Sequence, residues 1–249
     1  MLRLEHITVI FNKGTAGAVK ALQDVSLSIN NEEFLVVVGS NGSGKSTLMN
    51  VVAGSQAINT GKVIIDGNDV SAQPDFKRAQ YISRLFQNPL SGTAPELSII
   101  DNLRLAAHRT QLKGLSTGVN AAFRKQAAEK LLLLGMGLEN KMDQPVGSLS
   151  GGQRQALTLV MAIMDNSKLL LMDEPAAALD PKSSQMLMQQ ADIIIKEHKL
   201  TAILITHNLK DAYQYGNRLI IMSEGKIVKD IQGAEKTALK PEGLFELIG

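Results

Sequence analysis

The sequence contains Gly39-Ser40-Asn41-Gly42-Ser43-Gly44-Lys45-Ser46-Thr47, which matches the phosphate-loop pattern G-x-x-x-x-G-K-[ST] at every fixed position. Residues 33–38 are apolar and β-branched and predict a buried strand, while residues 46–53 predict a helix that Gly54 ends. This combination favours an anion, because backbone N–H groups converge there and the helix dipole adds positive charge. We expect Lys45 to reach the β- and γ-phosphates of a nucleotide and the Ser46 hydroxyl to ligate Mg²⁺. An incidental glycine-rich turn is the alternative, and the flanking elements argue against it.

The composition is that of an ordinary globular protein and excludes several classes of function. The chain has 249 residues, 44% of them hydrophobic, which suits one large α/β domain or a core with a smaller subdomain. The net charge of +2 gives no support for nucleic-acid binding, and the absence of cysteine excludes disulfides and thiolate-bound zinc. Neither a signal peptide nor an apolar run of the ~20 residues that span a membrane is visible. We therefore expect the protein to stay where it is made, and any membrane role to depend on a partner.

Strand and helix patterns along the chain predict an α/β fold, which together with the phosphate loop resembles the P-loop NTPase type. Residues 2–11 predict an edge strand and residues 19–29 a second strand, which together open an N-terminal antiparallel β subdomain. Helical spacing at 99–112 and 121–134 predicts an inserted α-helical subdomain over residues 89–165. Further strands are expected at 62–67, 169–173, 201–206, 218–222 and 226–228, and further helices at 154–164, 181–198, 208–215 and 241–248. Because buried strands alternate with helices, we expect a mostly parallel sheet in a single domain, 1–249, with its α/β core at 1–88 and 166–249.

A second signal lies in Leu169-Leu170-Leu171-Met172-Asp173-Glu174. Four apolar residues place Asp173 at the carboxyl end of a buried strand, where sheets of this class bind their ligands. Asp173 is expected to hold Mg²⁺ through water, because Mg²⁺ keeps several water ligands. Glu174 is placed to accept a proton from an attacking water. An acidic turn after a strand is the alternative.

The third signal is Leu149-Ser150-Gly151-Gly152-Gln153, ahead of the helix predicted at 154–164. Glycines and a serine at a helix N-terminus predict a second anion site, although one nucleotide does not need two such sites far apart in sequence. At these residues the chain resembles the ATP-binding cassette (ABC) family, whose signature sequence is LSGGQ. The order of phosphate loop, signature and Asp-Glu strand end makes the resemblance specific, and it covers nearly the whole chain.

The resemblance implies roles for further residues. Phe11 would stack on adenine, with a place in the hydrophobic core as the alternative. Gln87 would contact Mg²⁺ and the attacking water at the joint with the helical subdomain. His207 would contact the γ-phosphate, although a lone His after a strand is more often structural. Asp180 resembles part of a loop that crosses between subunits, where Ala178 replaces the usual Ser.

The mechanism that the resemblance implies is in-line attack of water on the γ-phosphate of ATP. Lys45, Mg²⁺ and the loop amides would stabilise charge, while Glu174 and His207 position or deprotonate the water. Ser46, Gln87 and Asp173 would hold Mg²⁺. The nucleotide would be bound by Phe11, residues 39–47, Asp180, and Ser150, Gly151, Gly152 and Gln153.

The resemblance also implies partners. In that family two chains pack head to tail over two ATP molecules, so we expect this chain to dimerise with itself or with a homologous chain. Five basic residues lie between positions 102 and 128 without an acidic one: Arg104, Arg109, Lys113, Arg124 and Lys125. We expect part of this surface of the helical subdomain to dock on the cytoplasmic loops of a membrane permease or near anionic lipid, with a merely solvated face as the alternative.

Three segments, residues 135–140, 153–159 and 215–220, resemble a group of importers. Their permeases are of the branched-chain amino acid type, and they work with extracytoplasmic substrate-binding lipoproteins. We therefore expect an ATPase subunit at the cytoplasmic face of the cell membrane that drives solute uptake, with aromatic amino acids as a suggested cargo. The alternatives are a soluble or mechanical ABC ATPase with a non-transport partner, and an exporter ATPase.

Overall fold

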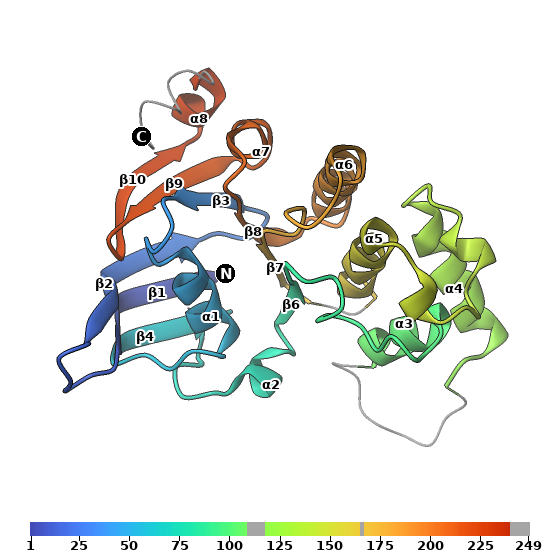
Figure 1. Ribbon diagram of the computed structural model, residues 1–249, viewed down its shortest axis with the longest axis horizontal. Helices are drawn as coiled ribbons and strands as arrows, with labels where there is room; N and C mark the ends of the chain where they lie inside the picture. The colour runs from blue at the N-terminus through green and yellow to red at the C-terminus, as the bar shows by residue number, and fades with distance from the viewer. Residues whose placement is uncertain (109–117, 165–166, 240–249) are drawn as a thin grey trace.

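Two β-sheets form the framework of the computed structural model, which describes residues 1–108, 118–164 and 167–239 (Figure 1). The smaller sheet is antiparallel, with β1 (Leu2–Phe11), β2 (Val19–Ile29), β4 (Thr60–Ile65) and β5 (Asn68–Asp69) in the order β2-β1-β4-β5. The prediction of an edge strand at residues 2–11 is wrong, because β1 pairs with β2 on one side and β4 on the other. Alternation of apolar and polar residues shows only that a strand has one buried face. In an antiparallel sheet both interior and edge strands have one buried face, so the pattern cannot tell them apart.

The larger sheet has the strand order β10-β9-β3-β8-β7-β6. Its strands are β3 (Phe34–Gly39), β6 (Ile82–Leu85), β7 (Leu169–Asp173), β8 (Thr201–Ile205), β9 (Arg218–Ser223) and β10 (Lys226–Gln232). All neighbouring strands are parallel except β9 and β10, which confirms the predicted mostly parallel sheet. Gly39, Asp173 and Ile205 therefore end their strands at one edge of the sheet, and the loops that follow them lie there.

The helices cover both faces of the larger sheet. They are α1 (Lys45–Ala53), α2 (Asp75–Arg78), α3 (Ile99–Ala107), α4 (Ala121–Leu132), α5 (Gly151–Ala162), α6 (Pro181–Glu197), α7 (Leu209–Gln214) and α8 (Ala234–Ala238), with short 3-10 turns η1 (Leu138–Asn140) and η2 (Val146–Ser148). Figure 1 shows α3, α4 and α5 together at the far side of the molecule from the smaller sheet, whereas α1 lies beside that sheet. None of the described helices is long and apolar enough to cross a bilayer.

Successive residues of β3 enter two different hydrophobic cores. Phe34 and Val36 pack with the residues of α3 to α7 on one face of the larger sheet. Leu35 and Val37 pack with α1 and the smaller sheet on the other face. The strand is buried on both sides, which explains why its sequence is a continuous apolar run.

Some predicted and observed elements differ. Patterns in the sequence did not predict β5, β6, α2 or α8. The helix predicted at 99–112 is described only to residue 108, and α3 ends at Ala107. The end of that prediction and the terminal helix at 241–248 lie outside the described residues.

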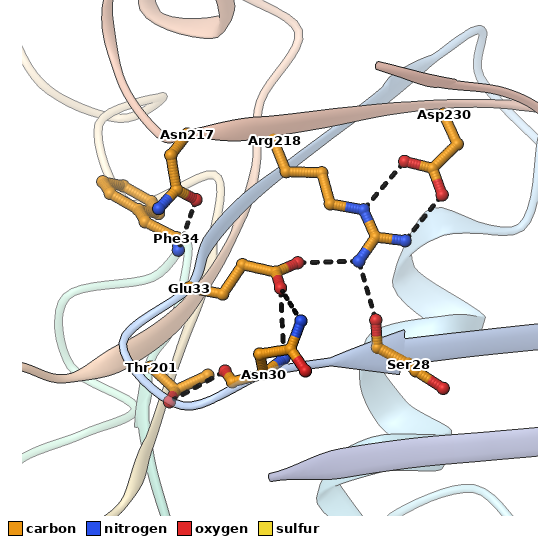
Figure 2. A network of polar contacts seen from close by, with 8 residues as sticks. All are labelled: Ser28, Asn30, Glu33, Phe34, Thr201, Asn217, Arg218 and Asp230. Carbon is orange, nitrogen blue, oxygen red and sulfur yellow. Dashed lines mark hydrogen bonds and ion pairs between the residues drawn. The ribbon is translucent and has the colours of Figure 1, made fainter. Parts of the chain in front are cut away.

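A buried ion-pair network around Arg218 lies at the opposite edge of the larger sheet, where β9 begins (Figure 2). The residue is 8% exposed. Its guanidinium donates to both carboxylate oxygens of Asp230, at 2.8 and 2.6 Å, and to Glu33 Oε1 at 2.7 Å. It also donates to the carbonyl of Ser28 at 2.7 Å, so the network ties β2 of the smaller sheet to β9 and β10. Pairing with Asp230 raises the pKa of Arg218.

Candidate functional site

The predicted phosphate loop joins β3 to α1 through a backbone that requires glycine at two points. A Cβ at Gly39 would lie 2.1 Å from the carbonyl oxygen of Met222, and one at Gly44 would lie 2.5 Å from that of Ala21. Both residues also have positive φ, at 149° and 100°. Gly44 precedes the first residue of α1, and within the described residues no side chain caps that helix. The first N–H groups of α1 are thus left without a side-chain acceptor, as an anion site requires.

Lys45 is the first residue of α1, and its side chain stabilises the phosphate loop. Its Nζ donates to the carbonyl oxygens of Gly39 at 2.8 Å and Ser40 at 2.9 Å. Burial lowers the pKa of Lys45, and the nearby carboxylates of Glu174 and Asp173 oppose that shift. A phosphate group would add a stronger, charged acceptor beside this ammonium group.

An open groove of about 610 Å³ brings several predicted residues together. Its lining comprises Phe11, Val19, Lys20, Ala21, Gln23, Asn41, Gly42, Gly44, Lys45, Ser46, Thr47, Glu174 and Glu224. Phe11 is 39% exposed, so the alternative that it belongs to the hydrophobic core is wrong. The groove therefore combines an aromatic ring, the glycine-rich backbone of the phosphate loop and the carboxylate of the residue that follows β7.

Asp173 stands at the end of β7 and is already paired. Arg84 Nη2, from β6, donates to its Oδ2 at 3.0 Å, and the two side chains are only 16% and 18% exposed. Arg84 is a residue that the sequence patterns did not single out. Its partner lies 89 positions away, so no local spacing could have indicated it.

Glu174 and His207 meet across two adjacent strand ends. Glu174 Oε2 lies 3.1 Å from His207 Nδ1. The backbone of Glu174 is left-handed, with φ of 48°, and its N–H donates to the carbonyl of Ile205 at 3.0 Å. A left-handed non-glycine residue stores backbone strain, which proteins concentrate at functional sites. The Glu174 side chain lines the groove together with Lys45.

The signature residues lie outside that groove. Ser150 caps α5 and forms a capping box with Gln153, whose backbone N–H donates to the Ser150 hydroxyl at 3.3 Å. A Cβ at Gly152 would lie 3.1 Å from Ser183 Cβ at the start of α6, so the two helix N-termini pack together. Asp180 caps α6, and hydrogen bonds from Ser183 lower the pKa of its carboxyl group. Residues 150–153 and Asp180 are thus neighbours of each other but not part of the groove lining.

Gln87 is exposed in the segment after β6, two residues beyond Leu85. The carbonyl of the preceding residue, Phe86, accepts a hydrogen bond from Gln155 Nε2 at 2.6 Å. Gln155 belongs to α5, so this bond joins the Gln87 segment to the signature helix. Sequence patterns missed Gln155 as well, because its partner is 69 positions away.

Comparison with known proteins decides the family. The family described as ABC transporter matches residues 22–177, more than half of the chain. The chain belongs to the ABC transporter family. It is 37% identical to the tyrosine transport ATP-binding protein of Clostridioides difficile (strain R20291), over 99% of this chain and 98% of that protein. It is also 32% identical to the phosphonates import ATP-binding protein PhnC of Lactococcus lactis subsp. lactis (strain IL1403), over 95% of each chain.

Solved structures give the same answer for the fold of this ABC ATPase. The dimeric structure of a post-hydrolysis state of an ATP-binding cassette bound to ADP and Pi matches with a TM-score of 0.79 and 28% identity, over 93% of this chain and 98% of that one. The predicted family and the predicted α/β P-loop NTPase fold are therefore confirmed. As a member of the ABC transporter family the chain binds ATP, and its ATPase activity is coupled to transport.

Proposed function

We propose that this ABC ATPase hydrolyses ATP in a site shared between two copies of the chain, and so drives a separate membrane permease in solute uptake. One observation carries the proposal. The groove holds Phe11, the phosphate loop and Glu174, while the signature at the N-terminus of α5 lies elsewhere on the same chain. A second chain, packed head to tail, would bring its signature to the ATP in this groove. The dimeric ATP-binding cassette with ADP and Pi supports that arrangement.

Within the groove, the residues suit the chemistry that ATP hydrolysis requires. Lys45 and the open N–H groups of α1 would hold the phosphates. Glu174 would orient or deprotonate the attacking water, and His207, 3.1 Å away, would hold the Glu174 carboxylate and contact the γ-phosphate. Charge that develops in the transition state would then meet donors that are already in place.

The oxygen atoms near the loop also fit a magnesium ion. Ser46 lines the groove, and Asp173 lies close enough to act on the pKa of Lys45. Mg²⁺ prefers oxygen ligands such as hydroxyl, carboxylate, water and phosphate. We therefore infer that Ser46, Asp173 and Gln87 together hold the ion. When bound, Mg²⁺ would neutralise charge on the β- and γ-phosphates.

We infer that residues 89–165 form the helical subdomain of a single ABC ATPase domain and carry the permease surface. The predicted basic surface needs revision, because two of its members are engaged within the chain: Arg124 pairs with Asp143, and Arg104 lies 4.8 Å over the ring of Phe123. Arg109 and Lys113 lie outside the described residues. Leu90, Leu97 and Leu105 are exposed apolar side chains of this segment, and we infer that they contribute to a surface for docking a protein.

The cargo that we propose is a small solute of the amino-acid type. A relative that aligns over nearly its whole length is a tyrosine transport ATP-binding protein, and another is an import ATP-binding protein. Uptake would require a substrate-binding protein outside the membrane, and this ATPase would lie at the cytoplasmic face through its permease. Loss of uptake of such a solute on deletion of the gene would support this proposal, and unchanged uptake would contradict it.

The ring of Phe11 gives a direct test of nucleotide binding. Phe11→Ala should raise the Kd of a non-hydrolysable ATP analogue about tenfold, because stacking on a base contributes about 1–3 kcal/mol. Isothermal titration calorimetry measures it. Phe76→Ala is the matched control, since Phe76 is 71% exposed but lies on α2 outside the groove lining. Equal affinities for wild type and Phe11→Ala would contradict adenine stacking at this position.

Leu105 tests the permease surface. This side chain of α3 is 57% exposed, so Leu105→Glu should leave folding and basal ATPase activity intact. We expect co-purification with the partner permease to fall about tenfold or more, because a charge would have to be buried in the interface. Val228→Glu, an exposed change on β10, should have no effect. Undiminished co-purification and uptake with Leu105→Glu would place the interface elsewhere.

A further inference from the structure

Arg84 occupies a position that the proposed catalytic roles do not use. Its Nη2 donates to Asp173 Oδ2 at 3.0 Å and to Asn50 Oδ1 at 2.8 Å. Its guanidinium carbon lies 4.8 Å from the centre of the Phe86 ring. The side chain therefore joins three parts of the site: the helix that follows the phosphate loop, the end of β7, and the segment that leads to Gln87.

One donor of this guanidinium lacks a hydrogen-bond acceptor among the described residues. Within the described part of the chain, Arg84 Nε is buried and has no hydrogen-bond partner. An arginine that served only to stabilise the fold would be expected to use its donors more fully, because a buried donor without an acceptor is unfavourable. Arg218, for comparison, uses Nε, Nη1 and Nη2 together. Arg84 thus holds Asp173 through one hydrogen bond, beside its bond to Asn50 and its contact with the Phe86 ring.

Another cation, Lys45, also acts on Asp173. Its Nζ, however, hydrogen-bonds to the carbonyls of Gly39 and Ser40, so its effect on Asp173 is exerted through space. Among the described residues, Arg84 is the cation that the structure pairs directly with this carboxylate.

We propose that Arg84 pairs with the Asp173 carboxylate in nucleotide-free protein and releases it when the Mg²⁺ of the nucleotide binds. This inference rests on the proposed function, which assigns Mg²⁺ to Asp173. Two cations that share one carboxylate in a half-buried site weaken each other. By reciprocity, Arg84 lowers the affinity for Mg²⁺ to the same extent that Mg²⁺ weakens the Arg84–Asp173 pair. Arg84 is a positioning residue, and it does not itself touch the reacting atoms.

The test is a comparison of nucleotide binding with and without Mg²⁺. For each variant, the Kd of a non-hydrolysable ATP analogue in excess EDTA is divided by its Kd in MgCl₂, both from isothermal titration calorimetry. Free nucleotide behaves identically in every titration, so differences between variants belong to the protein. We expect this ratio to rise about tenfold in Arg84→Gln, because a competing positive charge is gone. Arg84→Met, which keeps an aliphatic side chain, should raise the ratio to a similar extent. It replaces Arg84→Gln in the experiment if Arg84→Gln does not fold.

Arg84→Lys is the matched control. It keeps the charge beside Asp173, so its ratio should stay close to that of wild type. A purely structural role predicts that Arg84→Gln changes both Kd values equally, and an unchanged ratio would therefore overturn the proposal. A ratio in Arg84→Lys as high as in Arg84→Gln would do the same, because charge would not be the cause. A wild-type ratio of one would instead refute the magnesium site, and with it that part of the proposed function.

Discussion

Glu174→Gln should slow ATP turnover by about 10²–10⁴-fold while ATP still binds, because the change removes the proposed general base and leaves the phosphate loop untouched. Gln keeps the size of the side chain, so the groove and the contact region of His207 should persist. ATP that is bound but not hydrolysed should hold two chains together. Phosphate release and size-exclusion chromatography with light scattering, at micromolar protein in ATP, measure the two effects.

Glu224→Gln is the matched control for that experiment. Glu224 lines the same groove and, like Glu174, has a positive φ, at 47°. It does not lie at the end of β7, so its replacement should leave turnover near the wild-type rate. Wild-type turnover in Glu174→Gln, together with a monomer in ATP, would contradict both the catalytic role and the shared site.

The second large effect concerns stability and the network in Figure 2. Arg218→Met should lower the free energy of unfolding by about 3–5 kcal/mol, because it leaves the buried Glu33 carboxylate and Asp230 without their cation. For a chain of this size that corresponds to a fall in Tm of about 10 °C. Differential scanning calorimetry and urea unfolding measure it.

Arg3→Met is the comparison for the Arg218 experiment. Arg3 pairs with Glu5 at 2.8 Å, but both side chains are exposed. An exposed pair contributes less than about 1 kcal/mol, so this variant should unfold almost as wild type does. Similar losses in the two variants would mean that the buried network contributes no more than a surface ion pair.

Most strands of the larger sheet could be predicted because their own residues form a recognisable apolar pattern. Residues 34–38 and 169–172 are short, continuous apolar runs, as expected of strands that are buried on both faces. By contrast, β6 and α2 have four residues each, too few to establish a period. The place of β1 between two strands depends on pairing with distant segments, which its own alternation does not record.

The candidate site divides in the same way. The phosphate loop, Asp173, Glu174 and the signature could be predicted because each depends on neighbours in sequence. Arg84 and Gln155 could not, because their partners are 89 and 69 positions away. The basic surface was overestimated for a related reason, since Arg124 is neutralised by Asp143 from a later turn. A count of charges along the chain does not reveal which of them are paired.

The left-handed backbone of Glu174 has a consequence for laboratory evolution. Asn tolerates this conformation better than Glu, so an exchange at position 174 would relieve strain while removing the proposed base. A campaign that selects variants for heat resistance alone would therefore not select against loss of the proposed base at this position. Libraries of this protein screened for survival on heating should be expected to accumulate inactive nucleotide binders unless turnover is selected in the same round.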